Sequence, residues 1–169
     1  VNSALADKDE TVQDEAARTL SNWPGNWPED AAAAAPLLAL AKTGKKMSHR
    51  ILALRGYVQY VQGAKKFNEA QKLAKLEEVL PLAKRREEKV LVISALGEIR
   101  TGGALKMLAT MAADPAIAEE ACSAIVNLLR KGVKDASKQQ RREVLETAVA
   151  KAKSARTKKT AQQLLKAIQ

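Results

Sequence analysis

The sequence has few of the side chains from which enzyme sites are usually built. Its 169 residues include one His, one Cys, two Trp, two Tyr and one Phe, and no glycine-rich phosphate-binding loop. A nucleophilic pair would have to combine Cys122 with His49, and a structural zinc ion takes about four Cys or His ligands. We therefore expect a protein that is not an enzyme, with no catalytic residue, no metal site and no cofactor. Cys122 is interpreted as a small core residue.

Long hydrophobic runs and strand patterns are missing as well. No apolar stretch reaches the about 20 residues that cross a bilayer, so no membrane insertion is expected. The single Cys excludes a disulfide within the chain. Few segments alternate β-branched or aromatic residues with polar ones, as a half-buried strand would. Together these absences predict an all-α fold.

What the sequence does contain is helical periodicity. Apolar residues make up 46% of the chain. They recur three or four positions apart, which places them on one face of an α-helix. Such faces must be covered by neighbouring helices. The stripes occupy residues 12–23, 51–61, 90–99, 117–128 and 161–168, and the segments predicted to cover them are 31–41, 68–83, 104–113 and 137–153.

The helices form an internal repeat. The segment Leu37–Lys42 (LLALAK) recurs 42 residues later as Val79–Lys84 (VLPLAK), and Gly56 aligns with Gly97 at a distance of 41 residues. A period of this length predicts stacked antiparallel helix pairs, here about four to five in a right-handed α-α superhelix. The two aligned glycines are predicted to allow a neighbouring helix to approach closely.

Prolines and capping residues divide the repeat. Pro24 and Pro28, with Gly25 between them, are predicted to end the first helix. Pro36 and Pro81 fall within predicted helices and are expected to bend them. A cap at Asp114 followed by a proline is predicted to open the helix over 117–128.

Several segments carry a resemblance to a known family: Ala17–Pro24 (ARTLSNWP), Leu37–Ala41 (LLALA), His49–Tyr57 (HRILALRGY) and Ala95–Gly97 (ALG) after Glu87–Lys89 (EEK). The succession resembles HEAT-repeat modules of large proteins from planctomycete-type bacteria. It covers nearly the whole chain and implies a single HEAT-repeat domain over 1–169, without a catalytic role. It further implies an exported multidomain bacterial protein, of which this chain, starting without Met, is expected to be a fragment.

The positive charge is regional. Residues 1–40 carry two basic and seven acidic side chains, a net of −5, whereas residues 41–110 carry fifteen basic and six acidic ones, a net of +9. An anionic partner would explain this bias, although we favour a solvated helical surface. In two successive helix pairs, the second helix starts with a cluster of basic side chains. Stacking of the pairs would align these clusters into one basic ridge. This basic ridge consists of Lys45, Lys46, Arg50, Arg55, Arg85, Arg86 and Lys89.

The main functional hypothesis is a monomeric binding or scaffold module that presents a preorganised concave surface to a protein partner, with an acidic surface as one candidate. The first alternative is a nucleic-acid-binding protein related to the HEAT-like glycosylases that remove alkylated bases, with Trp27 and Asp30 at the lesion. The acidic first quarter and the scarcity of stacking aromatics count against it. The second alternative is a spacer between domains. We interpret Trp23, Trp27, Tyr57 and Tyr60 as packing residues.

Overall fold

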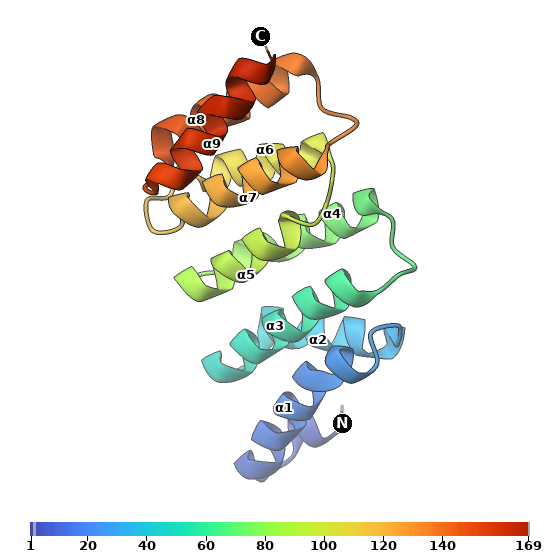
Figure 1. The fold of residues 1–169 in the computed structure, drawn as a ribbon. Coiled ribbons are helices and arrows are strands. Elements are labelled where there is room, and N and C mark those ends of the chain that lie inside the picture. Colours follow the sequence, from blue (N-terminus) through green and yellow to red (C-terminus); the bar gives the residue numbers. More distant parts are fainter. Residues whose placement is uncertain (2, 169) are drawn as a thin grey trace. The chain divides into compact units, whose positions relative to one another are not determined.

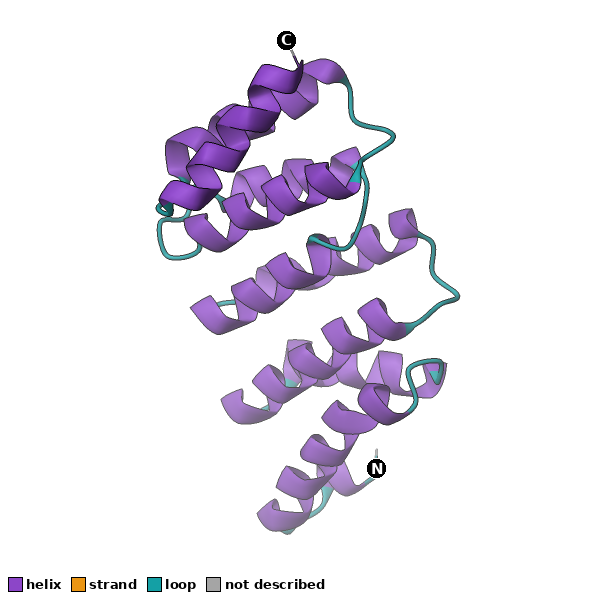
Figure 2. Ribbon diagram, in the orientation of Figure 1, coloured by secondary structure: helices purple, strands orange, loops and turns teal. Residues whose placement is uncertain are grey.

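The structure, a computed structural model, describes residue 1 and residues 3–168 (Figure 1). All regular elements in this described part are helices and none is a strand, which confirms the all-α prediction (Figure 2). The chain divides into two compact units, Val1–Glu88 and Lys89–Gln169, and each is described by itself. The single domain over 1–169 stays a prediction.

The α-helices are α1 (Glu10–Asn26), α2 (Ala34–Thr43), α3 (Met47–Gly63), α4 (Glu69–Val79), α5 (Arg86–Leu96), α6 (Gly102–Met111), α7 (Ala118–Lys131), α8 (Lys138–Lys151) and α9 (Ala155–Ile168). The short 3₁₀ helices are η1 (Ala4–Ala6), η2 (Ala31–Ala33) and η3 (Leu80–Leu82).

Each predicted segment is helical, because the apolar stripes and the capping residues favour the same elements. Several α-helices begin after a residue whose side chain accepts a hydrogen bond from a backbone N–H of the first turn. Asn68 makes this bond reciprocal, since the Gln71 side chain accepts from the Asn68 backbone N–H. These capping residues include Asp9 before α1, Asn68 before α4, Thr101 before α6, Ser137 before α8 and Ser154 before α9.

In the first unit, α3 is the central helix and packs against both α1 and α2. Ala17 and Leu20 of α1 are buried, as are Leu54, Tyr57 and Val58 of α3. Burying one such large apolar side chain contributes about 1.5–3 kcal/mol. The interpretation of Tyr57 and Tyr60 as packing residues is confirmed, because each is only 2% exposed.

In the second unit, α7 is the central helix and contacts α6, α8 and α9, while α6 also contacts α8. The buried face of α7 includes Ala121, Ile125 and Leu128, which are three or four positions apart as the stripe predicted. Cys122 lies in the same core and is fully buried, so its interpretation as a core residue is confirmed.

Two helix ends differ from those that the prolines predicted. Helix α1 continues through Pro24 to Asn26, because Pro24 is buried in its last turn and Trp27 N–H still donates to Trp23 C=O at 2.9 Å. Helix α7 begins only at Ala118, since Pro115 lies in a turn where Asp114 accepts from Ala116 N–H. Pro81 stands inside η3, where α4 gives way to a tighter turn.

Only one of the two aligned glycines marks a close helix approach. A β-carbon at Gly56 would lie 2.7 Å from Ser21 C=O and 2.9 Å from the Leu37 side chain. At Gly97 the nearest atom would be 3.4 Å away, within ordinary contact, and α5 has already ended at Leu96. The prediction is therefore confirmed for Gly56 and wrong for Gly97, because a β-carbon at residue 97 would make only ordinary contacts, including one with Ala124 of α7.

Candidate binding surface

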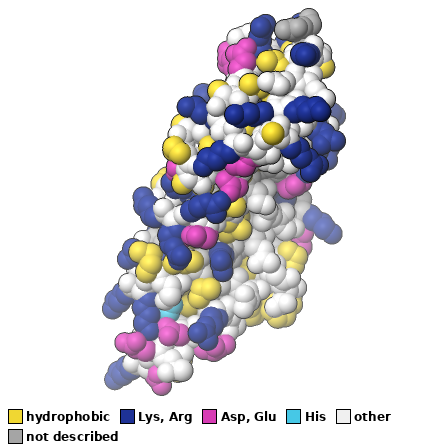
Figure 3. All heavy atoms as spheres, turned by 60° about the vertical axis from the view of Figure 1, so that its left-hand side comes forward, with side chains coloured by type: hydrophobic (Ala, Val, Ile, Leu, Met, Phe, Trp, Pro, Cys, Tyr) yellow, Lys and Arg dark blue, Asp and Glu magenta, His cyan; other side chains and the backbone are white. Residues whose placement is uncertain are grey.

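The basic ridge predicted from sequence is divided between the two units. Lys45, Lys46, Arg50, Arg55, Arg85 and Arg86 belong to the first unit and Lys89 to the second. Figure 3 shows Lys and Arg side chains spread over the visible face, with Asp, Glu and hydrophobic side chains among them. That the seven residues form one surface stays a prediction.

Lys46 contributes to a salt-bridge network between α1 and α3. Its ammonium lies 2.8 Å from Asp14 and 3.0 Å from Glu10, and His49 Nε2 lies 2.7 Å from the same Asp14 oxygen. The hydrogen bond from Lys46, and then that from His49, lowers the pKa of Asp14 below its ordinary 3.8. The bond to Asp14, followed by that to Glu10, raises the pKa of Lys46 above 10.5. Lys46 and His49 therefore serve helix packing first.

Other ridge residues have a range of partners. Lys89 is 2.7 Å from Asp114 and both side chains are about one-third exposed. Arg85 lies 3.7 Å from Glu87, a looser and well-exposed pair of small energetic weight. The Arg50 Nε donates to Gly44 C=O, which holds its guanidinium at the start of α3. Lys45 and Arg55 are exposed.

In the second unit, a groove with a volume of about 730 Å³ lies between α5 and α7. It is shaped by short side chains: Ser94 and Gly97 on one wall face Ser123 and Ala124 on the other. A β-carbon on Gly97 would lie 3.6 Å from the Ala124 β-carbon, so the walls approach without filling the space. The groove therefore runs along two helices, α5 and α7, that the sequence predicted as the second members of their helix pairs.

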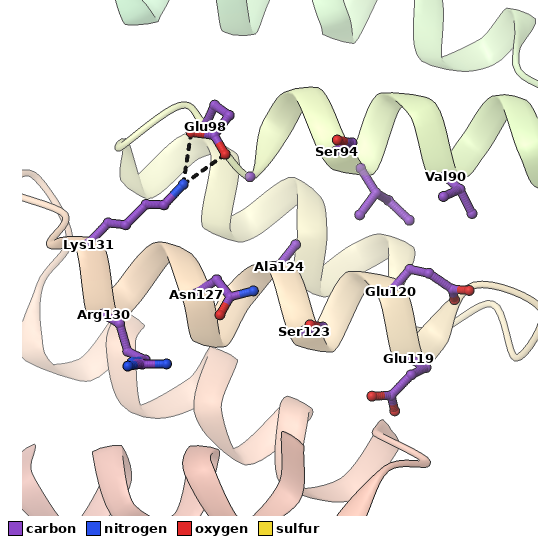
Figure 4. Close-up of a pocket in the computed structure, with 12 residues that line it drawn as sticks. Val90, Ser94, Glu98, Glu119, Glu120, Ser123, Ala124, Asn127, Arg130 and Lys131 are labelled. Carbon is purple, nitrogen blue, oxygen red and sulfur yellow. Dashed lines mark hydrogen bonds and ion pairs between the residues drawn. The ribbon is translucent and has the colours of Figure 1, made fainter. Parts of the chain in front are cut away.

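The ends of the groove differ in charge. Glu98 and Lys131 reach across one end and pair at 2.7 Å, as Figure 4 shows. Val90 and Glu120 lie at the opposite end (Figure 4). The groove therefore offers small apolar and polar side chains along its length and charged groups at its ends, a mixture that protein-binding surfaces also show.

Sequence reasoning missed this groove, although a signal was present. Ser94 and Gly97 on the first wall, with Ala124 and Asn127 on the second, are small or polar residues spaced three apart beside the apolar stripes. Spacing of three keeps residues on one helix face. The sequence prediction instead placed the candidate surface at the helix starts, because the basic ridge residues cluster there.

Glu119 borders the groove but has a structural role. Its carboxylate accepts hydrogen bonds from the backbone N–H groups of Lys153 and Ser154 and from the Thr157 hydroxyl. Burial raises the pKa of Glu119, but the bonds from Ser154, Thr157 and Lys153 outweigh it, so the pKa is lowered from 4.5. Glu119 thereby fastens the start of α9 to α7 as an ionised cap.

Cys122 offers little nucleophilic reactivity. Burial, and then the charge of Glu119, raises the pKa of its thiol to about 11. Since the thiolate is the nucleophile, the thiol is almost entirely in its unreactive form at neutral pH. His49 is held by Asp14 in the other unit.

The tryptophan segment only partly matches the packing interpretation. Trp23 is half-buried, and its indole N–H donates to Asp30 at 2.8 Å. Trp27 is 53% exposed, with its ring centroid 4.6 Å from that of Trp23, so the interpretation of Trp27 as packed is wrong. Trp27 follows the last residue of α1 and has no stripe to join. The bond from Ala32 N–H, then that from Trp23, lowers the pKa of Asp30, which favours a capping role over a proton donor.

Two kinds of feature are absent from residues 1 and 3–168. No group of three or more His, Cys, Asp or Glu side chains there is placed to hold a metal ion. None of the helices in that part of the chain is long and apolar enough to cross a membrane.

In comparisons with known proteins, the chain matches no family model, no curated protein and no solved structure.

Proposed function

We propose that the chain is a non-enzymatic binding module, a HEAT-type array of antiparallel helix pairs in a right-handed superhelix that presents its second helices to a protein partner. Helix packing within each unit supports the array. In the first unit α1 contacts α3, and in the second unit α7 contacts α9 while α6 contacts α8. Contacts between alternate helices are what stacked helix pairs require.

The observation that carries the proposal is the groove between α5 and α7. Its volume of about 730 Å³ and the short side chains on its walls leave room for a partner element such as one helix face or an extended segment. Its polar ends, Glu98 with Lys131 and Glu120, would orient that element. The hydrogen bonds that hold Glu119 as a structural cap support a binding role over a catalytic one for this lining residue.

Filling the groove tests the proposal. Ser94→Trp combined with Asn127→Trp introduces two bulky rings from exposed positions on its two walls and leaves the core unchanged. Lys106→Trp combined with Thr110→Trp on α6 is the matched control, because both residues are exposed and neither lines the groove. We expect a partner captured from source-organism lysate by wild type and control to be lost from the groove-filled variant. Equal capture by all three proteins would contradict use of the groove.

Nucleic-acid binding is the second candidate, and the exposed ring of Trp27 favours it. An exposed aromatic ring can stack on an unpaired base. A fluorescence titration against duplex and single-stranded DNA at two salt concentrations, with Trp27→Ala as the comparison, tests this candidate. Binding that is salt-dependent and weakened by Trp27→Ala would favour nucleic acid over protein.

A further inference from the structure

A second, smaller hollow lies in the first unit, where the end of α2, the start of α3 and the segment between η3 and α5 meet. Its volume is about 200 Å³. That is below the about 300–1,000 Å³ of pockets for small-molecule ligands, so it suits one inserted side chain. The proposed function does not use this hollow, which we call the cationic pocket.

The floor of the cationic pocket is aliphatic. Ile51 and Leu54 of α3 and Leu82 of η3 line it, together with Ala41 at the end of α2. Met47, which is 59% exposed, stands at its edge. None of the lining residues is aromatic, so the pocket lacks the ring on which a nucleic-acid base would stack.

Four cations surround this floor: Lys42, Arg50, Lys84 and Arg85. Lys42 is paired with Glu78 at 2.6 Å, and Arg85 lies 3.7 Å from Glu87. Lys84 and Arg50 form no salt bridge with any residue in the described part of the chain. Their positive charges are therefore available to an anionic group at the mouth of the pocket.

A buried carboxylate holds the rim in place. Glu88 is 6% exposed and accepts hydrogen bonds from the backbone N–H groups of Lys84 at 2.8 Å and Arg85 at 3.0 Å. The bond of Arg50 Nε to Gly44 C=O restrains the opposite side. Because these contacts exist before any ligand binds, less ordering is needed on association.

We propose that the cationic pocket binds an acidic segment of a partner protein, with one aliphatic side chain on the floor and flanking carboxylates against Arg50 and Lys84. The inference rests on the proposed function and specifies the chemistry of the partner. Charge complementarity selects the acidic segment, and the aliphatic floor without aromatic residues selects a peptide over a nucleic acid.

The test uses a defined probe in a fluorescence anisotropy titration of the whole chain. The probe is a short fluorescein-labelled peptide of Asp and Glu residues with one central Leu. Arg50→Glu and Lys84→Glu are the pocket variants. Arg18→Glu is the matched control, because Arg18 is exposed in the same unit, lies outside both the basic ridge and the pocket lining, and gives the same change in net charge.

We expect the wild-type chain to bind the probe with a Kd below about 1 mM and each pocket variant to bind about tenfold more weakly. Arg18→Glu and the wild type should agree within about threefold, and a probe with Ser in place of Leu should bind about tenfold more weakly. Circular dichroism and thermal melting check that the variants remain folded.

Four results would overturn the inference. The first is no binding of the probe. The second is equal weakening by Arg50→Glu and Arg18→Glu, which would reduce the effect to net charge. The third is equal binding of the Leu and Ser probes. The fourth is that a single-stranded oligonucleotide binds more tightly than the peptide and that the pocket variants abolish this binding. Loss of partner capture on filling the α5–α7 groove, with no probe binding here, would leave the binding function standing without this pocket.

Discussion

Gly56 of α3 lies so close to Ser21 of α1 that a β-carbon at residue 56 would be 2.7 Å from the Ser21 carbonyl oxygen and 2.9 Å from its Cα. Real β-carbons do not approach backbone atoms this closely, so one helix would have to move. The Ser21 hydroxyl donates to Ala17 C=O at 2.7 Å, which keeps that polar group satisfied at the crossing. Glycine at residue 56 therefore sets the distance between α1 and α3.

Gly56→Ala is expected to lower the free energy of unfolding by about 1–3 kcal/mol, despite the higher helix propensity of alanine, because the new methyl group overpacks the crossing. Gly97→Ala is the matched control and should change it by less than about 0.5 kcal/mol, since its β-carbon meets only ordinary contacts. Urea denaturation of both variants measures the difference. Similar losses for the two would show that the α1–α3 approach is not the cause.

Leu96→Ala is expected to cost about 2–5 kcal/mol, because Leu96 is fully buried and truncation leaves a cavity. Val12→Ala serves as the comparison, since Val12 is 39% exposed and loses little burial. Thermal and urea unfolding measure both. A Leu96→Ala midpoint close to that of the wild type would contradict the placement of Leu96 in the core.

Asp14→Asn is expected to make stability less dependent on acid pH. The pKa of Asp14 is lower in the folded chain than the ordinary 3.8, so its contribution is present above 3.8 and is lost as pH falls through the folded-state pKa. The urea midpoint should therefore fall less between pH 7 and about pH 3 in Asp14→Asn than in the wild type. Glu15→Gln, on the same helix with a side chain 70% exposed, should behave like the wild type. If the two variants lose stability equally, the bonds to Lys46 and His49 do not act as described.

Cys122 is expected to be unreactive toward a disulfide reagent in the native chain at about pH 8, because the thiol is fully buried and its pKa is raised to about 11. One thiol per chain should react once urea unfolds the protein. Absorbance of the released thiolate follows both reactions. Rapid stoichiometric reaction without denaturant would contradict burial of Cys122 in the α7 core.

Prediction from sequence succeeded where a local pattern decides the outcome. The stripe of Ala121, Ile125 and Leu128 identified α7 and its buried face, because spacing along the chain alone sets which side chains share a helix face. Helix ends were predicted less well. The continuation of α1 through Pro24 and the late start of α7 depend on tertiary burial and on turn hydrogen bonds.

The candidate surfaces show the same division. Sequence identified the cations at the start of α3 but did not show that Lys46 pairs with Asp14 and Glu10 whereas Arg50 and Lys84 border an aliphatic hollow. The packing interpretation also failed for Trp27, which has no apolar stripe to join and is 53% exposed. Partners more than thirty residues apart depend on how helices pack, and no spacing rule reaches that far.

The amino-acid sequence by itself determined the helical class, the order of the helices and their buried faces, since propensity, capping and periodicity act within a few residues. Only the tertiary structure decided that Gly56, and not Gly97, marks a helix crossing, and that short side chains open a groove between α5 and α7. The physical reason is that close packing and hollows depend on the distance between two surfaces, and each helix sequence specifies only one of them.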